Sequence, residues 1–166
     1  MSVLVDWQIE TLVKKYNLIT PFNREQLNPQ SYDVCMGNEV KILDGEMLSY
    51  DLSELKTIII PPMSFFWVST LEKCNLPPNI CATFILKSSM IRQPNGLIFC
   101  GGGHGDGGWS DSVWTIKLAN LESTEIEINY GQRFGQLVFN KTEMPREDYS
   151  IKGNYNNSQG LKLKGN

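Results

Sequence analysis

The pattern of apolar and polar positions changes near Pro21. Before this residue, apolar side chains recur at the spacing of one helix face: Val5, Ile9, Leu12, Val13 and Tyr16. The sequence therefore predicts an N-terminal helix, with Ser2 as its capping residue.

After Pro21 the apolar positions fall into short segments separated by Gly, Pro and Asn. They predict strands near Glu39–Leu43, Thr57–Ile60, Ser64–Ser69, Ile80–Leu86, Val113–Leu118, Glu125–Ile128 and Arg133–Phe139. Many short strands at this spacing are typical of a β-sandwich or barrel. No internal repeat or linker divides the chain.

The last eighteen residues, Tyr149–Asn166, have a different composition. They contain Lys152, Lys162 and Lys164, no acidic residue and few apolar ones. Two interpretations remain open: a frayed terminus, or a basic flap that orders over an anion.

The overall composition favours a soluble globular domain. Of 166 residues, 41% are hydrophobic and 20% charged, and the net charge of −3 argues against a broad nucleic-acid-binding surface. No apolar run approaches the roughly 18 residues of a membrane span, and the acidic start does not resemble a signal peptide. We expect a cytoplasmic protein whose four cysteines are buried free thiols.

A first candidate site is Lys87–Arg92, which follows a predicted strand. If a helical turn begins here, Ser88, Ser89 and Arg92 share one face and could bind an anion. The alternative is a simple helix cap followed by a surface arginine.

A second candidate is the loop Gly101–Gly108, which has six glycines among eight residues. Asp106 could orient a water molecule as a general base, and Trp109 could stack on a ring. The alternative is an Asx-turn with a core tryptophan. His104 is the only histidine, and with no second histidine or cysteine pair nearby it does not predict a metal site.

The alternation along Val113–Leu118 separates two sets of side chains. Trp114, Ile116 and Leu118 share one face, while Thr115 and Lys117 share the other. If the first face is core, Lys117 points to solvent or to the mouth of a site.

Six motifs in a fixed order resemble those of a known family. They are Asp6–Ile9 with Ile19–Phe22, Leu27–Gly37 (including Ser31 and Asp33), Lys87–Arg92, Asp106–Trp109, Gly131–Leu137 and Asn154–Gly160. In these residues the chain resembles, nearly end to end, the trimeric dCTP deaminase and dUTPase superfamily.

The resemblance implies a mainly β fold, a distorted β-barrel or jelly-roll of the dUTPase-like β-clip type. It implies a domain over residues 1–148, a mobile tail over 149–166, and a homotrimer with sites between subunits. It also implies a deoxynucleoside triphosphate ligand carrying Mg²⁺ on its phosphates, with no metal held by protein residues alone. By motif position, Asp106 is the catalytic candidate, and the binding candidates are Lys87, Ser88, Ser89, Arg92, Trp109, Gln136, Tyr155 and Gln159.

Three departures from the family pattern affect the expected reaction. Lys117 occupies the position of the deaminase glutamate, three residues before Asn120. The segment that shapes the pyrimidine pocket is replaced by Cys100–His104, with Pro94-Asn95 adding length before it, and Asn154 replaces the phosphate lysine of the tail, where Lys152 could substitute.

These departures lead us to expect a diphosphatase, most simply one that hydrolyses dUTP to dUMP and pyrophosphate. Two alternatives remain open: a dCTP deaminase, with or without the diphosphatase reaction, and an inactive nucleotide-binding regulator.

Overall fold

The structure is a computed structural model that describes residues 2–93, 98–99 and 103–164. Its strands are β1 (Ser2–Val3), β2 (Ile19–Thr20), β3 (Leu27–Asn28), β4 (Ser31–Asp44), β5 (Glu46–Asp51), β6 (Thr57–Ile60), β7 (Ser64–Cys74), β8 (Ile80–Leu86), β9 (Ile98–Phe99), β10 (Gly103–Gly105), β11 (Ser112–Asn120), β12 (Ile126–Asn129) and β13 (Arg133–Lys141). The helical segments are α1 (Asp6–Tyr16), the 3₁₀ turn Arg24–Gln26, α2 (Leu52–Leu55), α3 (Ser88–Ile91) and α4 (Tyr149–Lys152).

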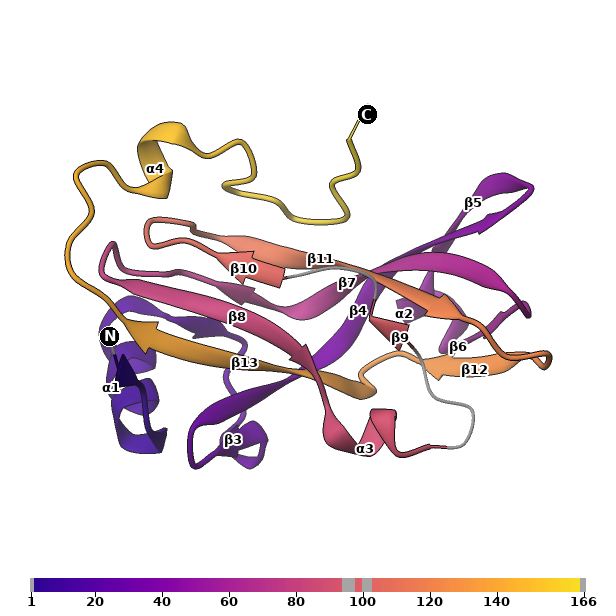
Figure 1. Ribbon diagram of the computed structural model, residues 1–166, viewed down its shortest axis with the longest axis horizontal. Coiled ribbons are helices and arrows are strands. Elements are labelled where there is room, and N and C mark those ends of the chain that lie inside the picture. The colour runs from indigo at the N-terminus through magenta and orange to yellow at the C-terminus, as the bar shows by residue number, and fades with distance from the viewer. Residues whose placement is uncertain (1, 94–97, 100–102, 165–166) are drawn as a thin grey trace.

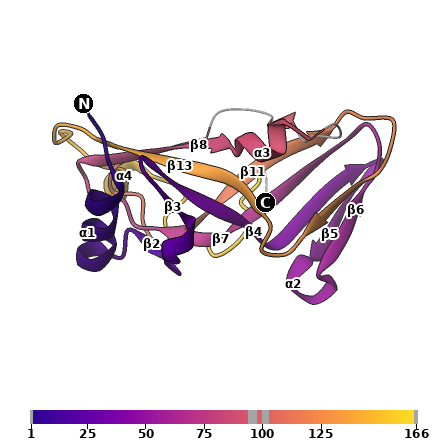
Figure 2. The same cartoon turned by 90° about the horizontal axis from the view of Figure 1, so that it is seen from below.

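Most strands belong to one curled sheet, which forms the half-barrel visible in Figures 1 and 2. Its main path runs β10-β8-β13-β4-β7-β11-β9. Strand β4 joins the two parts of the sheet: its first half pairs with β13 and its second half with β7 and β5. The register with β7 shifts between Met36 and Val40, and such irregularities bend a strand. The predicted mainly β fold is confirmed.

Gly37 lies within this irregular part of β4. A Cβ atom at this position would lie only 2.5 Å from the backbone oxygen of Thr70 on β7. Glycine therefore allows the two strands to approach closely where β4 changes partners.

Helix α1 is present as predicted, but its start differs from the prediction. Ile9 is fully buried and Leu12 and Val13 pack against the core, so the apolar face covers the sheet. Ser2 does not cap the helix, because it pairs with Lys141 of β13. Instead the side-chain oxygen of Gln8 accepts a hydrogen bond from the backbone N–H of Val5 (3.0 Å).

All seven predicted strands are present, although the apolar pattern underestimated the length of β4, β7, β11 and β13. The segment predicted near Glu39–Leu43 is the second half of a fourteen-residue strand, β4. The exposed hairpin strand β5 was missed, since its side chains alternate between half-buried and exposed and give a weak apolar signal. Among the described residues, no helix has the length and apolar character needed to cross a membrane.

Strand β13 offers a test of the packing. A Cβ atom on Gly135 would lie 2.1 Å from Cε2 of the buried Phe84 ring. We expect Gly135→Ala to lower the free energy of unfolding by about 1–3 kcal/mol through overpacking, measured by urea denaturation. Lys141→Ala, on an exposed side chain of the same strand, should change it by no more than about 0.5 kcal/mol. Equal effects of the two substitutions would contradict the packing described here.

Candidate active site

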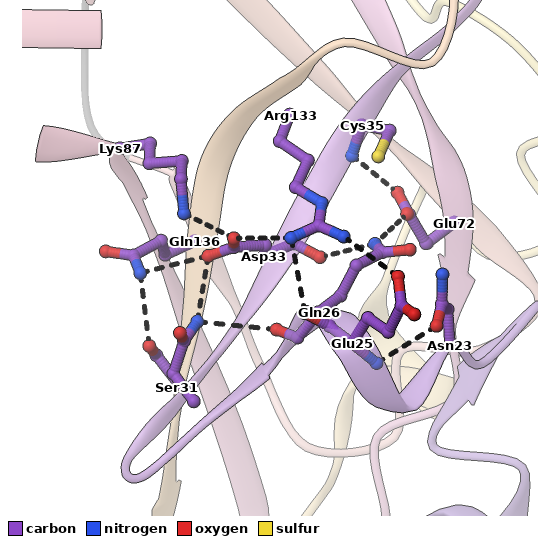
Figure 3. Close-up of polar contacts among 11 residues, drawn as sticks. Asn23, Glu25, Gln26, Ser31, Asp33, Cys35, Glu72, Lys87, Arg133 and Gln136 are labelled. Atoms are coloured by element: carbon purple, nitrogen blue, oxygen red, sulfur yellow. Dashed lines mark hydrogen bonds and ion pairs between the residues drawn. The ribbon is translucent and has the colours of Figure 1, made fainter. Parts of the chain in front are cut away.

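A buried carboxylate, Asp33 on β4, collects hydrogen-bond donors from three directions (Figure 3). It is 1% exposed and accepts hydrogen bonds from Asn28 Nδ2 (2.8 Å) and Gln136 Nε2 (3.1 Å). Its other oxygen forms an ion pair with Lys87 Nζ, and Arg133 Nη1 lies 3.8 Å from that oxygen. A charge removed from water requires such partners, so these four side chains are held around one point.

A second buried carboxyl, Glu72 on β7, lies beside this group. It accepts hydrogen bonds from Gln26 Nε2 (2.7 Å) and from the backbone N–H of Cys35 (2.9 Å). Gln26 Nε2 also donates to the backbone oxygen of Asp33 (2.8 Å), which links the Glu72 carboxyl to the main chain of β4 at Asp33. Burial raises the pKa of the Glu72 carboxyl, because the charged form loses its hydration.

The cysteines of the described residues are free, as predicted. Cys35 and Cys74 are buried and Cys81 is half-buried. Burial, together with the nearby Glu72 carboxylate, raises the pKa of the Cys35 thiol to about 12. It is therefore a neutral, unreactive thiol. Cys100 lies outside the described residues.

The first candidate anion site begins at Lys87, where β8 ends. The backbone N–H of Lys87 donates to Phe134 O of β13 (2.9 Å). Met90 is the buried residue on the inner side of the turn α3. Ser88, Ser89 and Arg92 are exposed around this turn. The predicted helical turn is confirmed, and it presents two hydroxyls and a guanidinium to solvent close to the Lys87–Asp33 pair.

Gln136 shares Asp33 with Lys87, and this contact fixes its amide. Its Nε2 lies 3.1 Å from Asp33 Oδ1 and 3.4 Å from Ser31 Oγ. A phosphate contact through Nε2, as the motif predicts, requires the amide to give up one of these bonds.

The second candidate site is a cavity of about 280 Å³ between β10, β11 and the C-terminal segment. It is lined by His104, Asp106, Trp109, Thr115, Tyr149, Tyr155, Ser158 and Lys162, among others. The Asp106 side chain is 64% exposed, and its Oδ1 lies 3.4 Å from His104 Nε2. The cavity thus combines aromatic walls with one accessible carboxylate, which suits a flat polar ring. Gly101 and Gly102 of the predicted glycine loop, and Pro94-Asn95, lie outside the described residues.

The C-terminal segment is docked along β11 rather than projecting from the domain (Figure 1). The indole Nε1 of Trp109 and the hydroxyl of Ser112 both donate to Tyr155 O (2.9 Å each). Further along, Val113 N donates to Ser158 O (2.9 Å). Leu161 N donates to Glu39 Oε2 (2.7 Å). Of the two interpretations of the tail, this arrangement favours an ordered segment, and closure over a nucleotide stays a prediction.

Trp109 is a core residue in this structure. It is 7% exposed, and its ring meets that of Trp114 edge-on with centroids 4.9 Å apart. Its indole nitrogen holds the tail backbone. Tyr155 has a half-exposed ring (47%) at the cavity, so this ring is better placed than Trp109 to stack on a ligand. Gln159 donates to Asp111 O (2.9 Å) and accepts a hydrogen bond from Lys73.

The two groups of candidate residues do not meet within one chain. The cavity lining contains none of Lys87, Ser88, Ser89, Arg92 and Gln136. Figure 1 shows α3 on the opposite side of the sheet from α4 and the tail. One copy of the chain therefore carries two partial sites.

Comparison with known proteins identifies the family of this chain. A sequence model of dCTP deaminase-like proteins matches residues 3–142. The chain belongs to the dCTP deaminase-like family. The dCTP deaminase of Thermococcus kodakarensis is 34% identical over 165 residues, covering 97% of this chain and 96% of the relative. A dUMP-forming dCTP deaminase of Methanoculleus marisnigri is 29% identical over 167 residues, covering 90% of this chain and 86% of the relative.

Solved structures confirm the fold. The 2′-deoxycytidine 5′-triphosphate deaminase of Agrobacterium tumefaciens aligns with a TM-score of 0.69 and 17% identity, covering 82% of this chain and 47% of that one. A dUTPase from Streptococcus mutans aligns with a TM-score of 0.54 and 16% identity, covering 75% and 88%. The chain thus has the fold that deaminases and dUTPases of this superfamily share.

Lys117, which by motif position is expected to replace the deaminase glutamate, lies over two aromatic rings. Its Nζ lies 4.7 Å from the centroid of Phe65 and 4.9 Å from that of Trp67. The predicted alternation is confirmed, since Trp114, Ile116 and Leu118 are buried while Lys117 and Thr115 are half-buried. Thr115 lines the cavity. Lys117 is two residues further along β11 and therefore lies on the same face of the strand.

From the sequence alone, no role could be assigned to the residues that surround Lys87. Asp33 was visible only as a motif position, and nothing marked Asn28, Gln26 or Glu72 as its neighbours. A buried acid inside an apolar strand was the available signal, since charged residues are seldom buried without partners.

The raised pKa of Glu72 predicts how stability depends on pH. The folded protein binds this proton more tightly than the unfolded chain, so the carboxyl stabilises most below its ordinary pKa of 4.5 and less as the pH rises. Glutamine does not titrate. We therefore expect the free energy of unfolding of wild type minus that of Glu72→Gln to decrease between about pH 4 and pH 7, measured by urea denaturation. A difference that grows with pH would contradict the assignment.

Proposed function

We propose that this chain is an enzyme of pyrimidine deoxynucleotide metabolism that acts on dCTP, as its relatives named dCTP deaminase do. The observation that carries the proposal is the similarity to such a relative over 97% of the chain. The two partial sites support it, because one suits phosphates and the other a flat polar ring.

In this proposal Lys87, Ser88, Ser89 and Arg92 bind the triphosphate. Ammonium, hydroxyl and guanidinium groups are the usual donors to phosphate oxygens. Among the described residues, no group of three or more His, Cys, Asp or Glu side chains is arranged to hold a metal ion. We propose that Mg²⁺ is bound mainly by the substrate phosphates, where the ion would neutralise part of their charge.

The pyrimidine and sugar would occupy the cavity beside Asp106. The exposed Asp106 carboxylate can orient a water molecule, and Tyr155 offers a ring for stacking. Since these residues and Lys87 lie on separate parts of one chain, a complete site needs a second copy. We propose the homotrimer expected for the superfamily, with each site shared by two subunits.

Lys117 bears directly on the deamination step. Replacing the amino group by water requires a group that takes a proton from the water and passes one to the leaving ammonia. The Lys117 ammonium lies over the rings of Phe65 and Trp67, and an ammonium group cannot accept that proton. We expect deamination to be slower by roughly 10²–10⁴ than with a glutamate at this position.

Hydrolysis of dUTP to dUMP and pyrophosphate is the second candidate reaction, and Lys117 is the observation that favours it. This reaction needs no proton transfer at the base. It requires positioned phosphates and an oriented water, which Lys87–Arg92 and Asp106 can supply.

The nature of the product separates these reactions. Wild-type protein is incubated with each deoxynucleoside triphosphate and Mg²⁺, and ammonia, pyrophosphate and nucleotides are quantified. We expect ammonia and a uracil nucleotide from dCTP. Hydrolysis of dUTP with dCTP left intact would replace the proposal by the second candidate. Binding without turnover would indicate a nucleotide-binding regulator instead.

Lys117→Glu tests the role of that position. We expect ammonia release from dCTP to rise at least about tenfold, because the variant regains a group able to transfer protons. Lys41→Glu is the matched control, since Lys41 pairs with Trp67 from the opposite neighbouring strand; it should leave the rate within about twofold. If both variants behave alike, Lys117 does not govern deamination.

Sharing of the site between subunits can be tested by mixing two inactive variants. Asp106→Asn and Arg92→Ala each disable a different partial site. Co-expression in equal amounts should restore about one quarter of wild-type activity, because random assembly leaves that fraction of shared sites intact. If mixing restores no activity although mixed trimers form, each site lies within one subunit.

A further inference from the structure

Asp33 occupies a position that no candidate role yet explains. It lies directly behind Lys87 and Gln136, two of the side chains expected to meet the triphosphate (Figure 3). We propose that Asp33 is a positioning residue: its buried carboxylate holds the Lys87 ammonium where a ligand phosphate meets it and fixes the Gln136 amide beside it. This inference rests on the proposed function.

The contacts of Asp33 can be met only by an ionised carboxylate. Lys87, Asn28 and Gln136 all direct donors at it, and Arg133 adds a second positive charge at 3.8 Å. A carboxylate has two oxygens and about four acceptor sites. Each of these donors can therefore bind a carboxylate oxygen of Asp33 at the same time.

The carboxylate acts on the Lys87 side chain rather than on its backbone. The backbone N–H of Lys87 is already fixed by Phe134 O (2.9 Å), independently of Asp33. A free lysine side chain has several rotatable bonds, and ordering it costs about 1.5–2 kcal/mol. Asp33 keeps the Lys87 side chain ordered before a ligand binds. The Lys87 side chain is 24% exposed while that of Asp33 is 2% exposed, so the remaining ammonium donors of Lys87 face outward to an anion.

Asp33 also sets the orientation of Gln136. Only an N–H can face a carboxylate, so Nε2 points inward toward Asp33 and Ser31. Figure 3 shows the amide oxygen on the other side, directed away from the cluster. The outward surface therefore carries the Lys87 ammonium, which can bind a phosphate, next to the Gln136 carbonyl oxygen, which cannot donate to one.

Asparagine at position 33 would break this arrangement with little change of volume. Its amide offers one acceptor oxygen, and its NH₂ would face donors from Lys87, Asn28 or Gln136. At least one of these side chains must then move. The loss of a negative charge by itself favours anion binding, but at physiological salt this general effect is screened over about 8 Å. We expect the displacement of the Lys87 ammonium to weaken anion binding more than the removal of the negative charge strengthens it.

The test uses the full-length chain and a double-mutant cycle of Asp33→Asn and Lys87→Met. Two quantities are measured at physiological salt: the affinity for inorganic tripolyphosphate by calorimetry, and kcat and KM for the best nucleotide substrate. In the wild-type background we expect Asp33→Asn to weaken tripolyphosphate binding at least about fivefold and to lower kcat/KM at least about tenfold. In the Lys87→Met background the same change should alter the affinity by less than about twofold.

Glu25→Gln is the matched control, because Glu25 also contacts Arg133 (3.9 Å) but is 85% exposed and contacts neither Lys87 nor Gln136. It should leave both quantities unchanged. Equal effects of Asp33→Asn in the two backgrounds, or tighter binding by that variant, overturn the inference. Absence of turnover with any nucleotide, while wild type still binds tripolyphosphate and the cycle shows coupling, refutes the proposed enzyme but supports the positioning role. Failure of wild type to bind either compound overturns both.

Discussion

The charge of Asp33 can remain buried only while partners from several strands surround it, and this requirement shapes one end of the molecule. Asn28 comes from β3, Lys87 from the end of β8, and Gln136 and Arg133 from β13. The cost of leaving a buried charge unpaired is several kcal/mol. The start of β4 is thus tied to both neighbouring segments, and the turn α3 begins where this network ends.

The other end of the molecule is organised by the backbone of the tail rather than by a charge. Tyr155 O accepts hydrogen bonds from an indole and a hydroxyl, and Leu161 N donates to Glu39. These contacts complete the cavity that contains Asp106. The curled sheet holds the two regions apart, and the proposed function therefore places each complete site between two copies of the chain.

The periodic parts of the fold could be predicted from sequence because they depend on local patterns. The spacing of Ile9, Leu12 and Val13 gave α1, and the alternation around Lys117 gave the two faces of β11. The capping residue and the length of β4 could not be predicted, since both depend on pairing with distant strands. Of the site, the motif positions of Lys87–Arg92 and Asp106 could be read from the sequence. The Asp33 network could not, because Gln26 and Glu72 are 46 residues apart along the chain.

The sequence also could not decide what Trp109 does, since an indole suits a ligand ring and a protein core equally well. In the folded chain it packs on Trp114 and binds the tail. Lys117 shows the opposite case. Its motif position predicts slow deamination, and its place over Phe65 and Trp67 supports that prediction. The chain belongs to the dCTP deaminase-like family, and we propose that its reaction depends on Lys117.

The shared site can be observed in a crystal structure of the chain with Mg²⁺ and a non-hydrolysable pyrimidine deoxynucleoside triphosphate. We expect the phosphates at Lys87, Ser88 and Arg92 of one copy and the pyrimidine ring beside Tyr155 and Asp106 of another. A nucleotide bound wholly within one copy, or away from both regions, would contradict it.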